Sequence, residues 1–235
     1  MKTQGAVRRD HSSAFTLVEI LVAIAIIAIL AGLLLPALAK SKDSAKKAQA
    51  KSEMANILGA IHNYEAEYGR MPVSPAAFNS TTPQCPDFTC GTVMADSTSM
   101  DSTTVINVQN SGYQNCNSEV ISILTDADRP PNKNHALNPN HHSFLNAKVA
   151  SGQNSAGIGT DGIYRDPWGH PYIITLDLNG DNQCQDGIYY RLEKGGNVDL
   201  VRLPAMVWSF GPDGKADAKV KANSGVNKDN ILSWK

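Results

Sequence analysis

The dominant pattern in the chain is an uninterrupted apolar run close to its N-terminus. No charged residue occurs from residue 20 to residue 39. About twenty residues at a rise of 1.5 Å span about 30 Å, which is the thickness of the hydrocarbon core of a bilayer. The pattern therefore predicts a membrane-spanning helix over residues 15–39.

Three residues in this run do not suit a plain anchor. Glu19 places a carboxylate just inside the apolar segment, which costs about 2.5–3.5 kcal/mol in a membrane unless the charge is paired. Pro36 has no N–H to donate to the carbonyl of Gly32, and glycine is itself a weak helix former. We expect Glu19 to have a partner, and a bend or local unwinding at Gly32 and Pro36 when such helices pack together.

The apolar run continues into an amphipathic pattern over residues 40–71. Small and apolar residues recur there at steps of three and four, and Gly69 and Pro72 then end the helical pattern. Such a helix needs a folded domain to cover one face. The predicted buried face contains Ala45, Ala48, Ser52, Ala55, Leu58, Ile61 and Tyr68.

The remaining residues, 72–235, predict a globular domain. Residues 72–161 are rich in Ser, Thr, Asn and Pro, which favours long loops, with residues 120–124 as a helical turn or a short strand. Three strands are predicted at residues 172–176, 187–192 and 205–210, as an antiparallel meander across the helix. The expected fold class is α+β, with a long N-terminal helix packed on a small antiparallel sheet with long loops.

Composition and motifs argue against two classes of function, nucleic-acid binding and catalysis. The net charge is −1 and the sequence pI is about 6.6, so nothing favours a nucleic-acid partner. The chain contains no nucleophile elbow, no metalloprotease helix motif and no phosphate-binding loop, so we do not expect an enzyme.

The four cysteines contain no C-x-x-C pair, which argues against a zinc knuckle. An even number in an exported chain favours disulfides, and four cysteines allow three pairings. We favour Cys85–Cys90, which closes a small loop, together with Cys116–Cys184. Reduced, buried thiols are the alternative.

Two polar segments offer oxygen or nitrogen ligands. His135, His141 and His142 lie in an Asn- and Pro-rich loop, where a solvated loop is favoured over a metal site because no cysteine or carboxylate accompanies them in ligand spacing. Residues 177–181 place Asp177, Asn179 and Asp181 at alternate positions, as at the start of a calcium loop. The favoured alternative is a polar hairpin turn, because Ile188 stands where a calcium loop carries a glutamate.

The segment Ala14-Phe15-Thr16-Leu17-Val18-Glu19, after a short basic leader, resembles the class III signal of type IV pilins and type II secretion pseudopilins. The resemblance implies a leader over residues 1–14, cleavage between Ala14 and Phe15, and methylation of the Phe15 amine. That family usually has glycine where Ala14 stands, and it places glutamate and proline where Glu19 and Pro36 lie. A signal anchor or a cleaved secretory signal peptide is the alternative. Glu19 is unusual for an ordinary anchor, and a secretory signal peptide has an apolar region of only about 7–15 residues with its small residues after that region.

Two further segments resemble the major pseudopilin of type II secretion. Residues 166–172 read DPWGHPY, close to its DPWGNPY, and residues 209–214 with residues 229–234 resemble its C-terminal end. That end holds calcium in the family, which implies Asp213 and Asp229 as calcium ligands here. A solvated tail is the alternative.

The resemblance implies a structural subunit of a type II secretion pseudopilus or a related filament. Its expected partners are other pilin-like subunits, the prepilin peptidase and methyltransferase, and the inner-membrane secretion assembly platform. The chain would cross the bacterial inner membrane once, with residues 72–235 in the periplasm, although the lysines after the span would favour the opposite orientation if counted alone. The alternative is a minor or tip subunit whose insertion, residues 72–161, binds a ligand or a secreted substrate.

Overall fold

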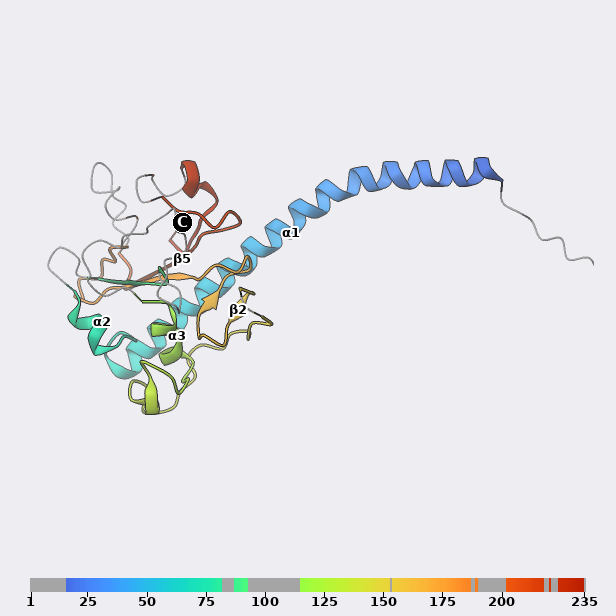
Figure 1. Cartoon of the computed structure of the whole chain (residues 1–235). Coiled ribbons are helices and arrows are strands. Elements are labelled where there is room, and N and C mark those ends of the chain that lie inside the picture. The colour runs from blue at the N-terminus through green and yellow to red at the C-terminus, as the bar shows by residue number, and fades with distance from the viewer. Residues whose placement is uncertain are drawn as a thin grey trace, which may run out of the picture. The chain divides into compact units, whose positions relative to one another are not determined.

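The computed structural model describes residues 16–81, 87–92, 115–152, 154–186, 189, 202–217, 220 and 224–234. Most of the helical residues lie in one long helix, and the strands are short (Figure 1). In chain order the elements are α1 (Leu17–Tyr68), α2 (Pro75–Asn79), β1 (Phe88–Cys90), α3 (Ser118–Leu124), the 3₁₀ turn η1 (Lys133–His135), β2 (Gly157–Ile158), β3 (Tyr164–Arg165), β4 (Ile173–Leu176), β5 (Ala205–Ser209), the 3₁₀ turn η2 (Gly225–Asp229) and β6 (Ile231–Leu232).

The helix α1 is 52 residues long and contains both helical segments that the sequence predicted. It is the one helix among the described residues that is long and apolar enough to cross a membrane. The chain divides into two compact units, residues 1–44 and residues 45–235, and α1 contributes residues to both.

The buried face of α1 differs from the predicted one. Ala45, Ala48, Ser52 and Ala55 are exposed, and of the predicted face only Ile61 is fully buried. Large side chains decide the face, because each removes more apolar surface from water than an alanine or a serine does. The buried residues are Ala50, Met54, Ile57, Ala60, Ile61 and Tyr64, again at steps of three and four.

A four-stranded antiparallel sheet in the order β1-β4-β5-β6 covers this face. The central strands β4 and β5 confirm two of the three predicted strands and pair directly, with Ile173 opposite Trp208 and Leu176 opposite Ala205. The third predicted strand, residues 187–192, lies outside the described residues except for Tyr189, which is in a turn. The flanking strands β1 and β6 were not predicted, because two or three residues are too few to show an alternating pattern.

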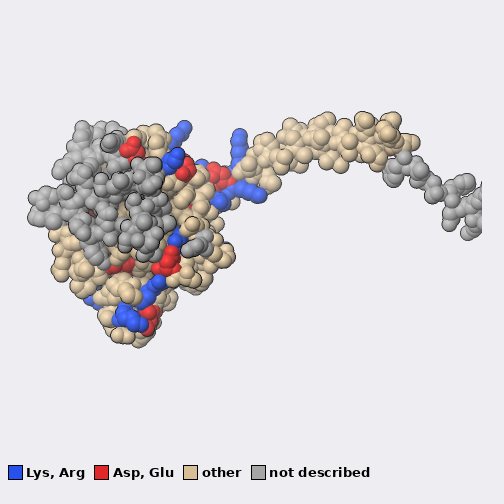
Figure 2. Space-filling view, viewed as in Figure 1, with Lys and Arg blue, Asp and Glu red and all other residues tan. Residues whose placement is uncertain are grey.

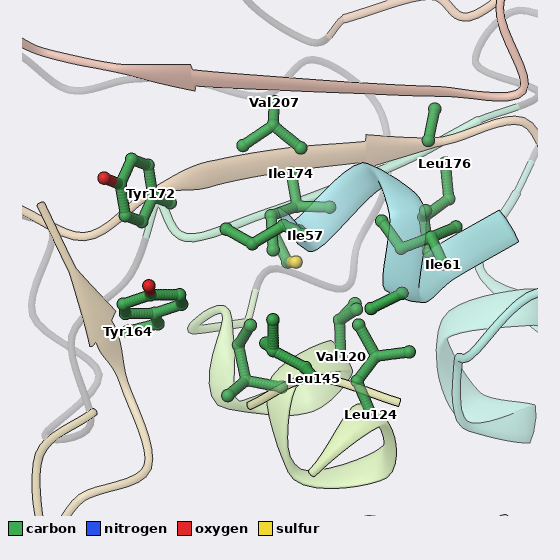
Figure 3. Packing of buried hydrophobic residues seen from close by; sticks show 14 of the residues in the cluster. Ile57, Ile61, Val120, Leu124, Leu145, Tyr164, Tyr172, Ile174, Leu176 and Val207 are labelled. Carbon is green, nitrogen blue, oxygen red and sulfur yellow. The ribbon is translucent and has the colours of Figure 1, made fainter. Parts of the chain in front are cut away.

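The core lies between α1, α3 and the sheet, as Figure 3 shows. Ile57 and Ile61 of α1 and Ile174 of β4 are all at most 1% exposed, as are Val120 and Leu124 of α3. Residues 120–124, for which the sequence left a helical turn or a short strand open, lie in the helix α3. Their β-branched residues would also suit a strand. The α+β fold class is confirmed.

Candidate functional site

Three hydrogen bonds between Thr16 and Glu19 hold the first turn of α1. The Thr16 hydroxyl accepts from the Glu19 backbone N–H at 3.2 Å, and the Glu19 carboxylate accepts from the Thr16 backbone N–H at 2.8 Å and from its hydroxyl at 2.7 Å. This is a capping box, and its Thr-x-x-Glu spacing along the chain is the signal from which it can be predicted. Ala14 and Phe15 lie outside the described residues.

The N-terminal part of α1 presents an apolar surface on all sides. Its large side chains are exposed, between 49% for Val22 and 80% for Leu17. In Figure 2 this part of the helix is almost entirely tan, without the lysines and acids that begin further along it. Such a surface is unfavourable in water, so it requires lipid or other apolar helices around it.

The helix runs continuously through Gly32 and Pro36 in the single chain. A Cβ added at Gly32 would meet nothing within 4 Å. The single chain is therefore not unwound at these residues, and a bend or local unwinding stays a prediction for the packed state.

The segment 166–172 forms a tight turn around a buried carboxylate. Asp166 is 0% exposed and accepts hydrogen bonds from the backbone N–H groups of Trp168 and His170, both at 2.9 Å, and from the Ser209 hydroxyl of β5. Burial raises the pKa of Asp166 above its usual range, against these hydrogen bonds and the nearby His170. The Asp166 carboxylate thus joins the turn to the sheet.

The same turn contacts α1. The Tyr172 hydroxyl donates a hydrogen bond to the Glu53 carboxylate, and the Lys46 ammonium lies 5.7 Å from the centre of the Trp168 ring. Both contacts lie within residues 45–235, so this turn is one of the elements that fasten the domain to the second half of α1.

The two predicted calcium ligands near the C-terminus lie next to each other. The Asp213 backbone N–H donates to the Asp229 carboxylate at 3.3 Å, and the Asp213 carboxylate accepts from the Lys215 backbone N–H at 2.9 Å. Gly211 allows this approach, because a Cβ there would lie 2.3 Å from the Asp229 carbonyl oxygen. Two carboxylates among backbone carbonyls are the donors that calcium prefers, so these residues fit the ion in chemistry.

The other predicted calcium segment is a hydrogen-bonded turn. The Asp177 carboxylate accepts from the backbone N–H groups of Gly180 at 2.8 Å and Asn182 at 2.7 Å. The Asn179 amide and the Asp181 carboxylate bond to each other at 3.1 Å. These bonds fit the polar turn that the sequence favoured, and calcium at this segment stays a prediction.

Asp87, which precedes β1, meets this turn from the other side. Its carboxylate accepts from the backbone N–H groups of Gln185 at 2.6 Å and Leu178 at 3.3 Å. Burial raises the pKa of Asp87 to about 7, and the charges of Asp177 and Asp181 add to this shift while the two hydrogen bonds oppose it.

The cysteines do not form the predicted Cys116–Cys184 bond, because both are free. The Cys116 sulfur contacts the Asn115 and Ser118 side chains at the start of α3. Cys184 is buried in the segment after β4, near the carboxylates of Asp87, Asp186 and Asp177. The two thiols thus lie in different surroundings that the spacing along the chain could not reveal.

The proposed partner of Cys85 is also free. Cys90 is fully buried in β1, and burial raises its thiol pKa well above the usual value, as it does for Cys184. Cys85 lies outside the described residues, but because the Cys90 thiol is free the structure does not show the predicted Cys85–Cys90 bond. For Cys90 and Cys184 the structure shows the alternative, reduced and buried thiols.

Two of the three histidines of the 135–142 loop meet a carboxylate that sequence analysis missed. The side chains of Asp126, His135 and His141 come together, each with one ligand atom within 4.8 Å of the others. His142 instead contacts Glu67 on α1, with its Nδ1 atom 2.8 Å from the carboxylate. Asp126 lies nine residues before His135, a separation that fits no standard ligand spacing.

Comparison with known proteins identifies the N-terminal part of the chain. The family described as the prokaryotic N-terminal methylation motif matches residues 9–35, which include Glu19 and the apolar surface described above. No curated protein and no solved structure matches the chain. The chain therefore carries a prepilin-type N-terminal motif on a long apolar helix, and these features support a type IV pilin-like, membrane-anchored protein that a prepilin peptidase processes.

Proposed function

We propose that this protein is a structural subunit of a type II secretion pseudopilus or a related type IV-like filament. The observation that carries the proposal is the apolar first half of α1, whose large side chains are all exposed in the single chain. Within a filament, the same half of neighbouring helices would cover this surface. Before assembly, the lipid of the bacterial inner membrane would cover it.

Processing would precede assembly. Removal of residues 1–14 leaves Phe15 with a free amine, which titrates near pH 8 and is therefore largely cationic at neutral pH. We propose that Glu19 of a neighbouring subunit pairs with this amine. Pairing offsets the desolvation that each charge would suffer alone in an apolar surrounding.

The test uses the full chain expressed with and without a prepilin peptidase. Mass spectrometry is expected to find the chain beginning at a methylated Phe15 only when the peptidase is present. Filaments containing the chain are then expected by electron microscopy when the assembly platform is also supplied. A chain that keeps residues 1–14 in the presence of the peptidase would contradict the proposal.

A tip subunit is the second candidate. The described part of the insertion includes the buried side chain of Asn117, which bonds the backbone of Tyr164 and Tyr172 at 2.8–2.9 Å. An ordered surface of this kind suits ligand binding more than a solvated loop does. Immunogold labelling separates the two candidates, because a major subunit is labelled along the whole filament and a tip subunit only at one end.

A further inference from the structure

The loop that follows α3 brings one carboxylate and two imidazoles together. The Asp126 Oδ1 atom lies 2.6 Å from His135 Nδ1, and its Oδ2 atom lies 3.1 Å from His141 Nδ1. The centres of the two imidazole rings are 4.1 Å apart. Each of the two carboxylate oxygens therefore faces a different histidine.

Buried asparagines hold this loop from its inner side. Asn132 and Asn138 are both 0% exposed. The side-chain Oδ1 atom of Asn132 accepts hydrogen bonds from the backbone N–H groups of Leu137 and Asn138, both at 3.1 Å. The Asn138 amide donates to the carbonyls of Ile123 at 3.1 Å and His142 at 2.7 Å. A buried hydrogen-bond network therefore holds the backbone of the loop that carries the two histidines.

The backbone at the same three residues is unusual. Asp126, His135 and His141 have φ angles of 55°, 55° and 57°. Residues other than glycine rarely adopt this left-handed conformation, and it occurs preferentially at functional sites. Here it turns all three side chains toward one point.

We propose that Asp126, His135 and His141 bind a divalent transition-metal ion of the zinc type. Imidazole nitrogens and carboxylate oxygens suit zinc, cobalt and nickel, whereas calcium takes oxygen ligands alone. This site is thus distinct from both calcium segments, and it does not depend on the role of the protein in a filament.

Binding requires only small movements. Ligand bonds of about 2.0–2.2 Å place the ligand atoms of a tetrahedral zinc site about 3.5 Å apart, so shifts of about 1 Å suffice. The metal would take the place of the protons between the carboxylate and the two Nδ1 atoms, and each neutral imidazole would then carry its N–H proton on Nε2. Three protein ligands leave one position for water or for a donor group from another molecule.

The experiment titrates the metal-free full chain, in detergent micelles and without a polyhistidine tag, with Co²⁺. Cobalt reports its coordination through visible absorption bands, and Zn²⁺ then competes for the same site. We expect saturation at one equivalent, bands typical of four-coordinate cobalt, and their loss on addition of Zn²⁺. An absence of saturable bands would overturn the proposal.

His141→Ala and His142→Ala form a matched pair of variants. Both side chains are largely exposed, at 60% and 55%, and each contacts a carboxylate through Nδ1, so neither substitution removes core packing. Changes even outside the first ligand shell weaken metal binding about 10–100-fold, so His141→Ala is expected to weaken Co²⁺ binding about 100-fold or more. His142→Ala is expected to bind as the original chain does.

Equal effects of the two variants, or no effect of His141→Ala, would mean that the histidines only pair with carboxylates and would overturn the proposal. Thermal unfolding gives a second measurement. Zn²⁺ is expected to raise the melting temperature of the original chain and of His142→Ala, and to leave that of His141→Ala unchanged. A rise of equal size in His141→Ala would also overturn it.

Discussion

At the scale of single residues, Glu19 has two possible partners. In the single chain its carboxylate bonds Thr16 and caps its own helix. In a filament we propose that it pairs with the amine of Phe15 on a neighbouring subunit. The two roles compete for the same oxygen atoms, so assembly would exchange a local hydrogen bond for a contact between subunits.

Glu19→Gln separates the two roles, because glutamine can still complete a capping box but carries no charge. We expect normal cleavage of the leader and a loss of filaments of about tenfold or more, since leaving one charge of a buried pair alone costs about 3–5 kcal/mol. The yield is measured by immunoblotting of sheared filaments. The control is Thr16→Val, which removes the cap but keeps the charge and is expected to assemble. Normal filament yield from Glu19→Gln would disprove the pairing.

Asp87 gives the domain a dependence on pH. Its pKa in the folded chain is about 7, above the value near 4 that an exposed aspartate has. A pKa that is raised on folding contributes stability below the unfolded value and loses it as the pH rises through the folded one. We therefore expect the melting temperature, measured with a chelator present, to fall between about pH 4 and pH 7.

The loss at Asp87 amounts to at most about 4 kcal/mol, since one pKa unit corresponds to about 1.4 kcal/mol. Asp87→Asn keeps the size of the side chain and removes the titration, so its melting temperature is expected to vary less over the same pH range. Asp166 also has a raised pKa and contributes in the same direction in both proteins. Parallel pH curves for the two proteins would show that Asp87 does not titrate in this range.

At the scale of elements, α1 contains a weak point. The helix is continuous at Gly32 and Pro36 in the single chain, but Pro36 cannot donate the hydrogen bond that the carbonyl of Gly32 would accept. We expect the segment 32–36 to bend or unwind where helices pack in a filament. A high-resolution filament map decides this, and a regularly hydrogen-bonded helix through residues 33–35 would rule it out. Pro36→Ala is expected to straighten the segment.

The C-terminal loop is the second element with a testable role. Asp213 precedes η2 and Asp229 is the last residue of η2, so an ion between them would link two segments that lie 16 residues apart in the chain. At a calcium concentration about 100 times the Kd, binding would add about 2.7 kcal/mol of stability. We expect a rise in melting temperature of about 5–10 °C in a chain of this size.

The combined substitution Asp213→Ala and Asp229→Ala is expected to abolish the calcium response. Thermal unfolding with calcium and with a chelator measures it. If the double variant keeps the full response, the ion binds elsewhere, and Asp177, Asn179 and Asp181 are the next candidates. If calcium has no effect on the original chain, neither segment binds it.

At the scale of the whole molecule, the local patterns were the predictable part. The apolar run, the Thr16–Glu19 motif and the central strands each show in a short window of sequence. The predicted buried face of α1 was wrong because it was built mainly on small residues, whereas the face that is buried carries the large side chains of Met54 and Ile57. The surface that a helix buries depends on what packs against it, and the sequence of the helix alone does not contain that information.

The candidate sites divide in the same way. Glu19 and the pair Asp213 and Asp229 were predicted from motifs, and the structure places the latter two side by side. Asp126 was missed because its contact with His135 and His141 depends on three left-handed backbone conformations and two buried asparagines. A contact of this kind depends on the tertiary structure, and the spacing of the residues along the chain does not predict it.

The way in which the domain holds α1 has a mechanical consequence. Among the described residues, the strands bond to one another and contact the helix through side chains, with Ile57 and Ile61 packed on the sheet and the Tyr172 hydroxyl bonded to Glu53. A pull along the helix axis therefore loads these side-chain contacts in shear, without first separating any pair of strands. The strength of a filament under tension would then depend more on the side-chain packing between the core and the helix than on the hydrogen bonds between strands.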